Sequence, residues 1–301
     1  MSTSKRLLLR LTMQCNSGCA HCTIADIAHH GDKTTDEAKA DIEEARRRGC
    51  TELVFMRGEP LLRPDLLRLV KFARRLGYEH IQVQTNARLL GPLANAEKLT
   101  RAGVNYFEVS FFGHNAGLHD RIDGSPGAFE QAAAGLANLV ELGCGVLVTV
   151  PVIKANYLRL DDITRWLHEL GVRRLQFNFS RPVQVGPQWQ TGCLVRLSEA
   201  SPFVRRAMGV ARDLGLTCET EAFPLCHLDP EFWSGGDIDA DFSSHRVDDV
   251  HRSEASRGET QRLARPYAPG CSGCQVRERC PTTWSAYQAL FGTWEFQPPP
   301  S

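Results

Sequence analysis

The sequence has no net charge, no long uncharged hydrophobic run, and no low-complexity tract or heptad repeat. Its 301 residues carry 35 basic and 35 acidic side chains, which argues against a protein that holds nucleic acid through a basic surface. The apolar stretch without a charge, Leu142–Ile153, is too short to cross a bilayer. No small-residue cleavage site follows the brief leucine cluster near the start. We therefore predict a cytoplasmic protein with neither a nucleic acid nor a membrane as its partner.

The eleven cysteines exclude a complete set of disulfides because their number is odd. In a cytosolic chain of this size the thiols should stay reduced. Most of them fall into two groups of three, one near each end of the chain: Cys15, Cys19 and Cys22, and then Cys271, Cys274 and Cys280. Cysteines clustered at ligand spacing in a reducing compartment indicate metal binding.

Short apolar runs alternate with longer amphipathic segments from residue 6 to residue 179. The apolar runs have the length of buried strands and cover 6–12, 52–56, 80–85, 106–111, 145–153 and 174–179. The helix-like segments between them, several of which precede a glycine, cover 35–48, 64–76, 92–102, 127–142 and 161–170. Such repeats predict parallel strands with right-handed crossovers, in a partial barrel or an open doubly wound sheet.

The remainder of the chain is less regular. Residues 180–200 are predicted to form an irregular connection and 201–214 one more helix. The polar segment 230–265 is predicted to be a lid, a linker or a substrate loop.

The first cysteine group has three intervening residues and then two, and it directly follows the first predicted strand. Three thiolates are one fewer than the four that close a [4Fe–4S] cluster or a structural zinc site. An iron without a protein ligand makes chemical sense if a small molecule must coordinate there. The loop is expected at the carboxyl end of a parallel strand, where α/β folds place their active sites.

Cys15, Cys19 and Cys22 resemble the cluster motif of the radical S-adenosylmethionine (radical SAM) superfamily. In that family the open iron chelates SAM, and one electron from the cluster then yields methionine and a 5′-deoxyadenosyl radical. The resemblance implies a [4Fe–4S] cluster and SAM as cofactors. It also places His21 near the adenine, since the residue before the third cysteine is commonly aromatic.

Other segments resemble the same family at the ends of later strands. Gly58, Glu59 and Pro60 are similar to its Gly-Gly-Glu-Pro segment, which binds the SAM ammonium, although Arg57 stands where the family usually has glycine. The resemblance implies further cofactor contacts at Thr85, Asn86 and Ser110. The run from His119 to Gly124, with Phe129, also looks like the family, although the pattern favours an ordinary helix-start turn for His119 and Asp120. Each match alone fits an ordinary turn, but all fall on one rim of the scaffold. A zinc-binding α/β domain is the alternative.

The second cysteine group has two and then five intervening residues, and it resembles the start of the auxiliary-cluster motif in SPASM and twitch extensions. Trp284 occupies the position of that motif's next cysteine, so Cys226 is the best candidate for a fourth ligand and Cys218 the substitute. A structural zinc site is the alternative. We therefore predict an α/β chain with a partial (β/α)6 TIM-like barrel in residues 1–200 and an auxiliary [4Fe–4S] extension in 201–301.

The resemblance implies removal of a hydrogen atom from an unreactive C–H bond, with an electron donor such as flavodoxin or ferredoxin as partner. Because no extension precedes the first strand, we expect a small-molecule substrate, such as a sugar, an aminoglycoside or another natural product. The expected outcome is dehydrogenation or epimerisation, with Cys193 or Cys218 as hydrogen donor unless both are buried structural thiols. Asn178, Ser180 and Arg181 are predicted to hydrogen-bond the substrate. A radical maturase of a ribosomal peptide and a non-catalytic zinc module are the alternative functions.

Overall fold

The computed structural model describes residues 6–24, 31–235, 245–246 and 264–298. Its main sheet is parallel throughout, in the order β10-β1-β2-β3-β4-β5-β6-β9. Its strands are β1 (Arg6–Arg10), β2 (Glu52–Met56), β3 (His80–Thr85), β4 (Tyr106–Ser110), β5 (Gly145–Val152), β6 (Arg174–Phe179), β9 (Thr217–Glu221) and β10 (His245–Arg246). A separate antiparallel hairpin joins β7 (Val183–Val185) to β8 (Gln188–Gln190).

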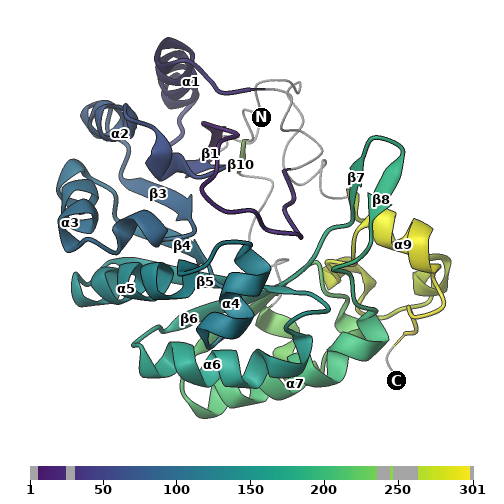
Figure 1. Ribbon diagram of the computed structural model, residues 1–301. Helices are drawn as coiled ribbons and strands as arrows, with labels where there is room; N and C mark the ends of the chain where they lie inside the picture. The colour runs from purple at the N-terminus through teal and green to yellow at the C-terminus, as the bar shows by residue number, and fades with distance from the viewer. Residues whose placement is uncertain (1–5, 25–30, 236–244, 247–263, 299–301) are drawn as a thin grey trace.

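The α-helices lie mainly in the crossovers between the parallel strands, and Figure 1 shows them following one another along the outer side of the sheet. They are α1 (Thr35–Arg47), α2 (Leu66–Arg75), α3 (Leu93–Ala102), α4 (Ala116–Asp123), α5 (Ala128–Glu141), α6 (Leu160–Glu169), α7 (Leu197–Asp213) and α9 (Ser285–Phe291). Short 3-10 helices cover Pro60–Leu62, Arg88–Leu90, Tyr157–Arg159, Leu225–His227, Pro230–Gly235, Pro269–Cys271 and Arg277–Arg279. Among the described residues no helix is both long and apolar enough to span a membrane.

The two faces of the sheet have opposite character. On β3, Ile81 and Val83 are fully buried in the same apolar core as Leu69 of α2. The alternate residues Gln82 and Gln84 point the other way and line a cavity of about 960 Å³. All seven longer strands of the main sheet contribute to this cavity, so the sheet curves around it. The fold is therefore a partial α/β barrel with a polar interior, which confirms the predicted fold class.

The structure adds elements that the sequence pattern does not predict. The strand β9 pairs with β6 and extends the six predicted strands to a seventh. The connection predicted as irregular contains the β7–β8 hairpin, and the helix predicted at 201–214 begins earlier, at Leu197. It begins there because Glu295 accepts hydrogen bonds from both the N–H and the hydroxyl of Ser198, at 2.9 and 2.6 Å.

The C-terminal residues pack against the end of the barrel. The hydroxyl of Tyr287 accepts a hydrogen bond from the Leu197 N–H at 2.8 Å, and the Trp284 indole donates to the Phe179 carbonyl at 2.8 Å. The division between domains at residue 200 stays a prediction, since α7 spans that position and β9 lies beyond it. Most of the segment 230–265 lies outside the described residues.

Candidate active site

The loop that carries Cys15, Cys19 and Cys22 begins directly after β1, at the carboxyl end of the sheet. The turn after β2 packs against it without space between the two backbones. A Cβ atom on Gly58 would lie 2.4 Å from the Gln14 carbonyl oxygen and 2.7 Å from that of Thr12. The Glu59 N–H donates to the Gln14 carbonyl at 2.7 Å. Glycine is therefore needed at position 58 for two reasons: a side chain would overlap the backbone of the cysteine loop, and the φ of Gly58 is +53°.

The Glu59 carboxylate is buried and ties β2 to β3. It accepts hydrogen bonds from the Thr85 hydroxyl at 2.9 Å, the Asn86 N–H at 2.8 Å and the Leu61 N–H at 3.0 Å. Burial raises the pKa of Glu59 to about 7, and the hydrogen bonds only partly oppose this. Pro60 begins the short helix that Glu59 caps. The predicted contacts of Gly58, Glu59, Pro60 and Thr85 with SAM stay predictions.

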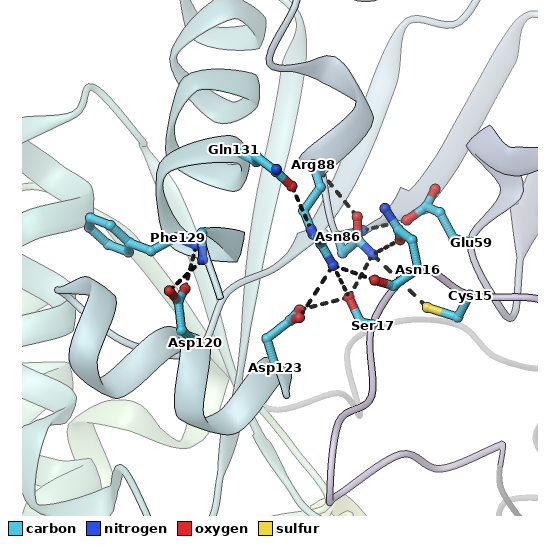
Figure 2. A network of polar contacts seen from close by, with 11 residues as sticks. Cys15, Asn16, Ser17, Glu59, Asn86, Arg88, Asp120, Asp123, Phe129 and Gln131 are labelled. Carbon is cyan, nitrogen blue, oxygen red and sulfur yellow. Dashed lines mark hydrogen bonds and ion pairs between the residues drawn. The ribbon is translucent and has the colours of Figure 1, made fainter. Parts of the chain in front are cut away.

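A polar network contacts the first cysteine loop (Figure 2). Asn86 donates to the side chains of Asn16 at 2.7 Å and Ser17 at 3.1 Å. Arg88 contacts the Asn16 carbonyl and forms a buried ion pair with Asp123, at 3.4 Å. The sequence reasoning missed Ser17, Arg88 and Asp123. Two signals in the sequence could have identified them: Arg88 lies two residues after Asn86, and Asp123 lies in the run 119–124 that resembles the family.

The rest of the run 119–124 is structural. Asp120 accepts hydrogen bonds from the N–H groups of Gly127 and Phe129, each at 2.7 Å, and so begins α5. His119 lies within α4, and its Nδ1 accepts from the Phe112 N–H at 3.3 Å.

The three loop thiols are close enough to affect one another electrostatically. Burial raises the pKa of Cys19, and the charges of Asp123 and then of Cys22 and Cys15 raise it further. Burial is also the main cause of the raised pKa of Cys15. Three thiolates without a metal would therefore repel one another in a partly buried loop, and a bound cation offsets that repulsion.

The three loop thiols are a soft donor set, which suits an iron–sulfur cluster. A [4Fe–4S] cluster takes each thiolate on a different iron. The loop is thus compatible with a cluster that has three protein ligands.

His21 belongs to the cysteine loop and lines both the barrel cavity and the smaller cavity beside the loop. Its ring meets Phe112 edge-on, with centroids 4.9 Å apart, and burial lowers its pKa to about 4. The neutral ring keeps a buried Nδ1 without a hydrogen-bond partner among the described residues. Ser110, at the end of β4, lines the same cavity. His21 and Ser110 therefore border the space next to the loop, and their contacts with SAM stay predictions.

The predicted auxiliary ligands come together at the other end of the chain. Cys226, Cys271, Cys274 and Cys280 border one small cavity. Burial, followed by the charges of Cys280 and Cys271, raises the pKa of Cys226 to about 12. We call these four residues the four-thiol site. Its geometry favours Cys226 over Cys218 as the fourth ligand.

The two candidate hydrogen donors occupy different places. Cys193 lines a cavity of about 330 Å³ together with Cys19, His21 and Cys22. Cys218 borders the large cavity but stands opposite Leu175 near the amino ends of the strands. The cysteine loop lies beyond their carboxyl ends. The structure therefore brings Cys193, and not Cys218, next to the loop, and a catalytic role for either stays a prediction.

A partial α/β barrel with a three-cysteine loop at its carboxyl rim and a polar interior defines a metal-dependent enzyme class. Residues 9–167 match the family model of the radical SAM superfamily. Since this match covers more than half of the chain, the chain belongs to that superfamily. The cofactors of the family are a [4Fe–4S] cluster and SAM.

Comparison with individual curated proteins and solved structures gives further matches. The chain is 38% identical over 194 residues to an AdoMet-dependent heme synthase of Methanosarcina barkeri, covering 62% of this chain and 54% of that protein. It is 29% identical over 172 residues to a PqqA peptide cyclase of Gluconobacter oxydans, covering 56% and 48%. The chain spans about half the length of the curated relatives it matches. In fold it resembles Streptococcus suis SuiB bound to S-adenosylmethionine, with a TM-score of 0.68, 14% identity, and coverage of 99% and 76%.

Proposed function

We propose that the chain is a radical SAM enzyme that removes a hydrogen atom from a polar small molecule held in the barrel. The observation that carries this proposal is the position of the cysteine loop at the mouth of a large polar cavity. The chemistry that the cluster and SAM supply when bound is a 5′-deoxyadenosyl radical, which abstracts hydrogen from a C–H bond. The chain itself must bind the substrate, orient that bond and exclude water.

The cavity supports a polar substrate. Its volume of about 960 Å³ lies at the top of the usual range for a single ligand site, so it can hold SAM together with a small second molecule. Its inward-facing side chains include Gln84, Glu108, Asn178 and Glu221. These side chains bond one another, since Gln84 donates to Glu108 at 2.9 Å and Asn178 donates to Glu221 at 2.9 Å. Their carboxylate and amide oxygens can accept further hydrogen bonds, so they suit a substrate rich in O–H and N–H groups.

The residues at the end of β6 support the predicted role in substrate binding. The Oδ1 atom of Asn178 is buried without a hydrogen-bond partner among the described residues, while its Nδ2 donates to Glu221 at 2.9 Å. An unpartnered acceptor in a cavity wall favours a ligand with an N–H or O–H group. Ser180 and Arg181 border the same space, and Arg181 also donates to the Thr23 carbonyl at 2.8 Å.

Two outcomes fit this arrangement. In dehydrogenation the substrate radical loses one electron and one proton, and the four-thiol site is where the chain would hold an auxiliary cluster as electron acceptor. In epimerisation the substrate radical regains one hydrogen atom, and the thiol of Cys193 is the donor nearest the loop. The thiyl left on Cys193 then needs one electron and one proton. A small redox protein such as flavodoxin or ferredoxin would supply the electrons.

The relatives favour a second candidate, action on a tetrapyrrole, since the first of them is named a heme synthase. The cavity contains Arg57, Arg174 and Arg181, which suit the carboxylates of such a molecule. Maturation of a peptide, suggested by the peptide cyclase, is the remaining alternative.

The test begins with anaerobic reconstitution of the full chain with iron and sulfide. Two clusters correspond to about eight irons per chain. Cys15→Ala and Cys226→Ala should each remove about half of this iron, and Cys218→Ala should remove none. With dithionite, the wild type should convert SAM to 5′-deoxyadenosine and Cys15→Ala should not. Bound zinc without SAM cleavage would overturn the proposal.

The substrate class is then compared in deuterated water with pooled sugars and aminoglycosides, an iron tetrapyrrole carrying propionates, and candidate peptides. Deuterium gained at carbon without oxidation means epimerisation, whereas loss of two hydrogens means dehydrogenation. Faster formation of 5′-deoxyadenosine with the tetrapyrrole or a peptide alone would replace the first candidate with the second or third.

A further inference from the structure

Each residue between the first two loop thiols is held by a group outside the loop. The Asn16 carbonyl accepts a hydrogen bond from the Arg88 guanidinium. The Ser17 hydroxyl donates to the Asp123 carboxylate at 2.7 Å. The Gly18 N–H donates to the main-chain oxygen of Asp123 at 2.8 Å. The backbone between the two cysteines is therefore held by Arg88, from the short helix after β3, and by Asp123, from the end of α4.

The Asn86 amide is oriented toward this loop. Its Oδ1 accepts a hydrogen bond from the Arg88 N–H at 3.1 Å, so its Nδ2 must face the other way. There Nδ2 lies 2.7 Å from Asn16 Oδ1, 3.1 Å from Ser17 Oγ and 4.0 Å from Cys15 Sγ. The two N–H groups of the amide thus face Asn16 and Ser17, and Nδ2 also lies at the limit of hydrogen-bond distance from the sulfur of the first cysteine (Figure 2).

The ion pair behind Asn86 is itself fixed. The side chain of Asp123 is 0% exposed and that of Arg88 is 11% exposed. The Arg88 Nε also donates to Gln131 on α5 at 2.9 Å. Breaking a buried pair of this kind is costly, because it leaves an uncompensated charge. It therefore holds the Asn86 backbone and the loop in one relative position.

We propose that Asn86, supported by the Arg88–Asp123 pair, is a positioning residue that tunes the cluster through the Cys15 sulfur. This inference rests on the proposed function, since it needs Cys15 to be a cluster ligand. Hydrogen bonds to ligand sulfurs are among the factors that set the reduction potential of iron–sulfur clusters. An N–H donated to a thiolate stabilises its negative charge, which grows on reduction, so the contact makes the cluster easier to reduce.

The test compares reconstituted wild type with Asn86→Ala by a redox titration followed by electron paramagnetic resonance. At a fixed potential, the ratio of reduced to oxidised SAM-site cluster should fall about tenfold in Asn86→Ala, which equals about 59 mV for one electron. Asn138→Ala is the matched control. Its carboxamide makes two hydrogen bonds to backbone carbonyls, at 2.8 and 2.9 Å, and is not among the contacts of the loop. The control should keep the wild-type ratio.

The possible results are distinguishable. If the wild type holds no cluster on Cys15, Cys19 and Cys22, the proposed function itself fails. If the cluster forms and Asn86→Ala keeps the wild-type ratio, only the present inference fails. Asn86→Asp keeps the shape of the side chain and replaces the donor with an anionic oxygen, so it should lower the ratio further. It serves in place of Asn86→Ala should that variant not fold.

A second readout follows the loop itself. Ser17→Ala and Asp123→Asn should release iron from this site to a chelator about tenfold faster than the wild type, because the loop between the thiols is less restrained. Arg101→Met breaks the exposed Arg101–Glu97 pair, at 3.0 Å, and should leave the release rate unchanged. Equal rates in all these proteins would overturn the role of the Arg88–Asp123 pair.

Discussion

The substitution Gly58→Ala tests the contact that joins the turn after β2 to the first cysteine loop. The new methyl group would lie 2.4 Å from the carbonyl oxygen of Gln14 and 2.7 Å from that of Thr12. Both neighbours are backbone atoms, so no side chain can rotate away to relieve the overlap. The change must therefore move the turn, the loop or both.

The expected loss has two parts. A non-glycine residue in the left-handed region costs about 1–2 kcal/mol, and Gly58 has a φ of +53°. Overpacking of a closed site adds about 1–3 kcal/mol. The free energy of unfolding should therefore fall by about 2–5 kcal/mol. Gly143→Ala is the matched control, because Gly143 has a φ of +67° and no atom within 4 Å of the added carbon. It should lose only the first part.

The assay is equilibrium unfolding in urea of the reduced, metal-free chain, followed by iron analysis after reconstitution. Gly58→Ala should lose about 1–3 kcal/mol more than Gly143→Ala, and it alone should bind less iron at the first site. If both variants lose the same free energy and retain the same iron, the two backbones do not meet as described. The reasoning about the loop would then be wrong.

Three further changes have expected results. Glu59→Gln removes a carboxyl group whose pKa is raised by burial to about 7. The folded wild type keeps this proton at pH values where the unfolded chain has lost it, so the wild type becomes less stable as the pH rises. Relative to the variant, its unfolding free energy should fall by about 3 kcal/mol between pH 5 and pH 8 in urea titrations. Arg57→Gly relieves a φ of +72° and should leave the unfolding free energy unchanged or about 1 kcal/mol higher, so any loss of SAM cleavage would identify a role for the guanidinium. Tyr287→Phe leaves the Leu197 N–H without its acceptor and should lower thermal stability by about 1–3 kcal/mol.

The local spacing of residues predicts much of this molecule. The six predicted strands are found because their outward side chains, such as Ile81 and Val83, are apolar and regularly spaced. The strand β9 was missed because its inward residues Thr217, Glu219 and Glu221 face a polar cavity instead of a core. Its sequence therefore has the composition of a loop, and only pairing with β6 makes it a strand.

The residues of the candidate site also differ in whether the local sequence predicts them. The cysteine loop is a local motif, so its residues can be identified without a structure. Its anchors are distant: Arg88 meets Asn16 across 72 residues and Asp123 meets Ser17 across 106. No periodicity encodes such a contact. The same limit explains why Glu295, which fixes the start of α7, could not be predicted from the helix itself.

Trp284 belongs both to the second cysteine motif and to the wall of the large cavity. The auxiliary motif that the sequence resembles would have a cysteine there, but the structure brings Cys226 to the other three thiols instead. Trp284 borders the large cavity. The Arg265 guanidinium lies 4.4 Å from the centre of its ring and pairs with Glu221 of β9 at 3.2 Å. Where the auxiliary motif has a cysteine, this chain thus has an aromatic side chain in the wall of the large cavity.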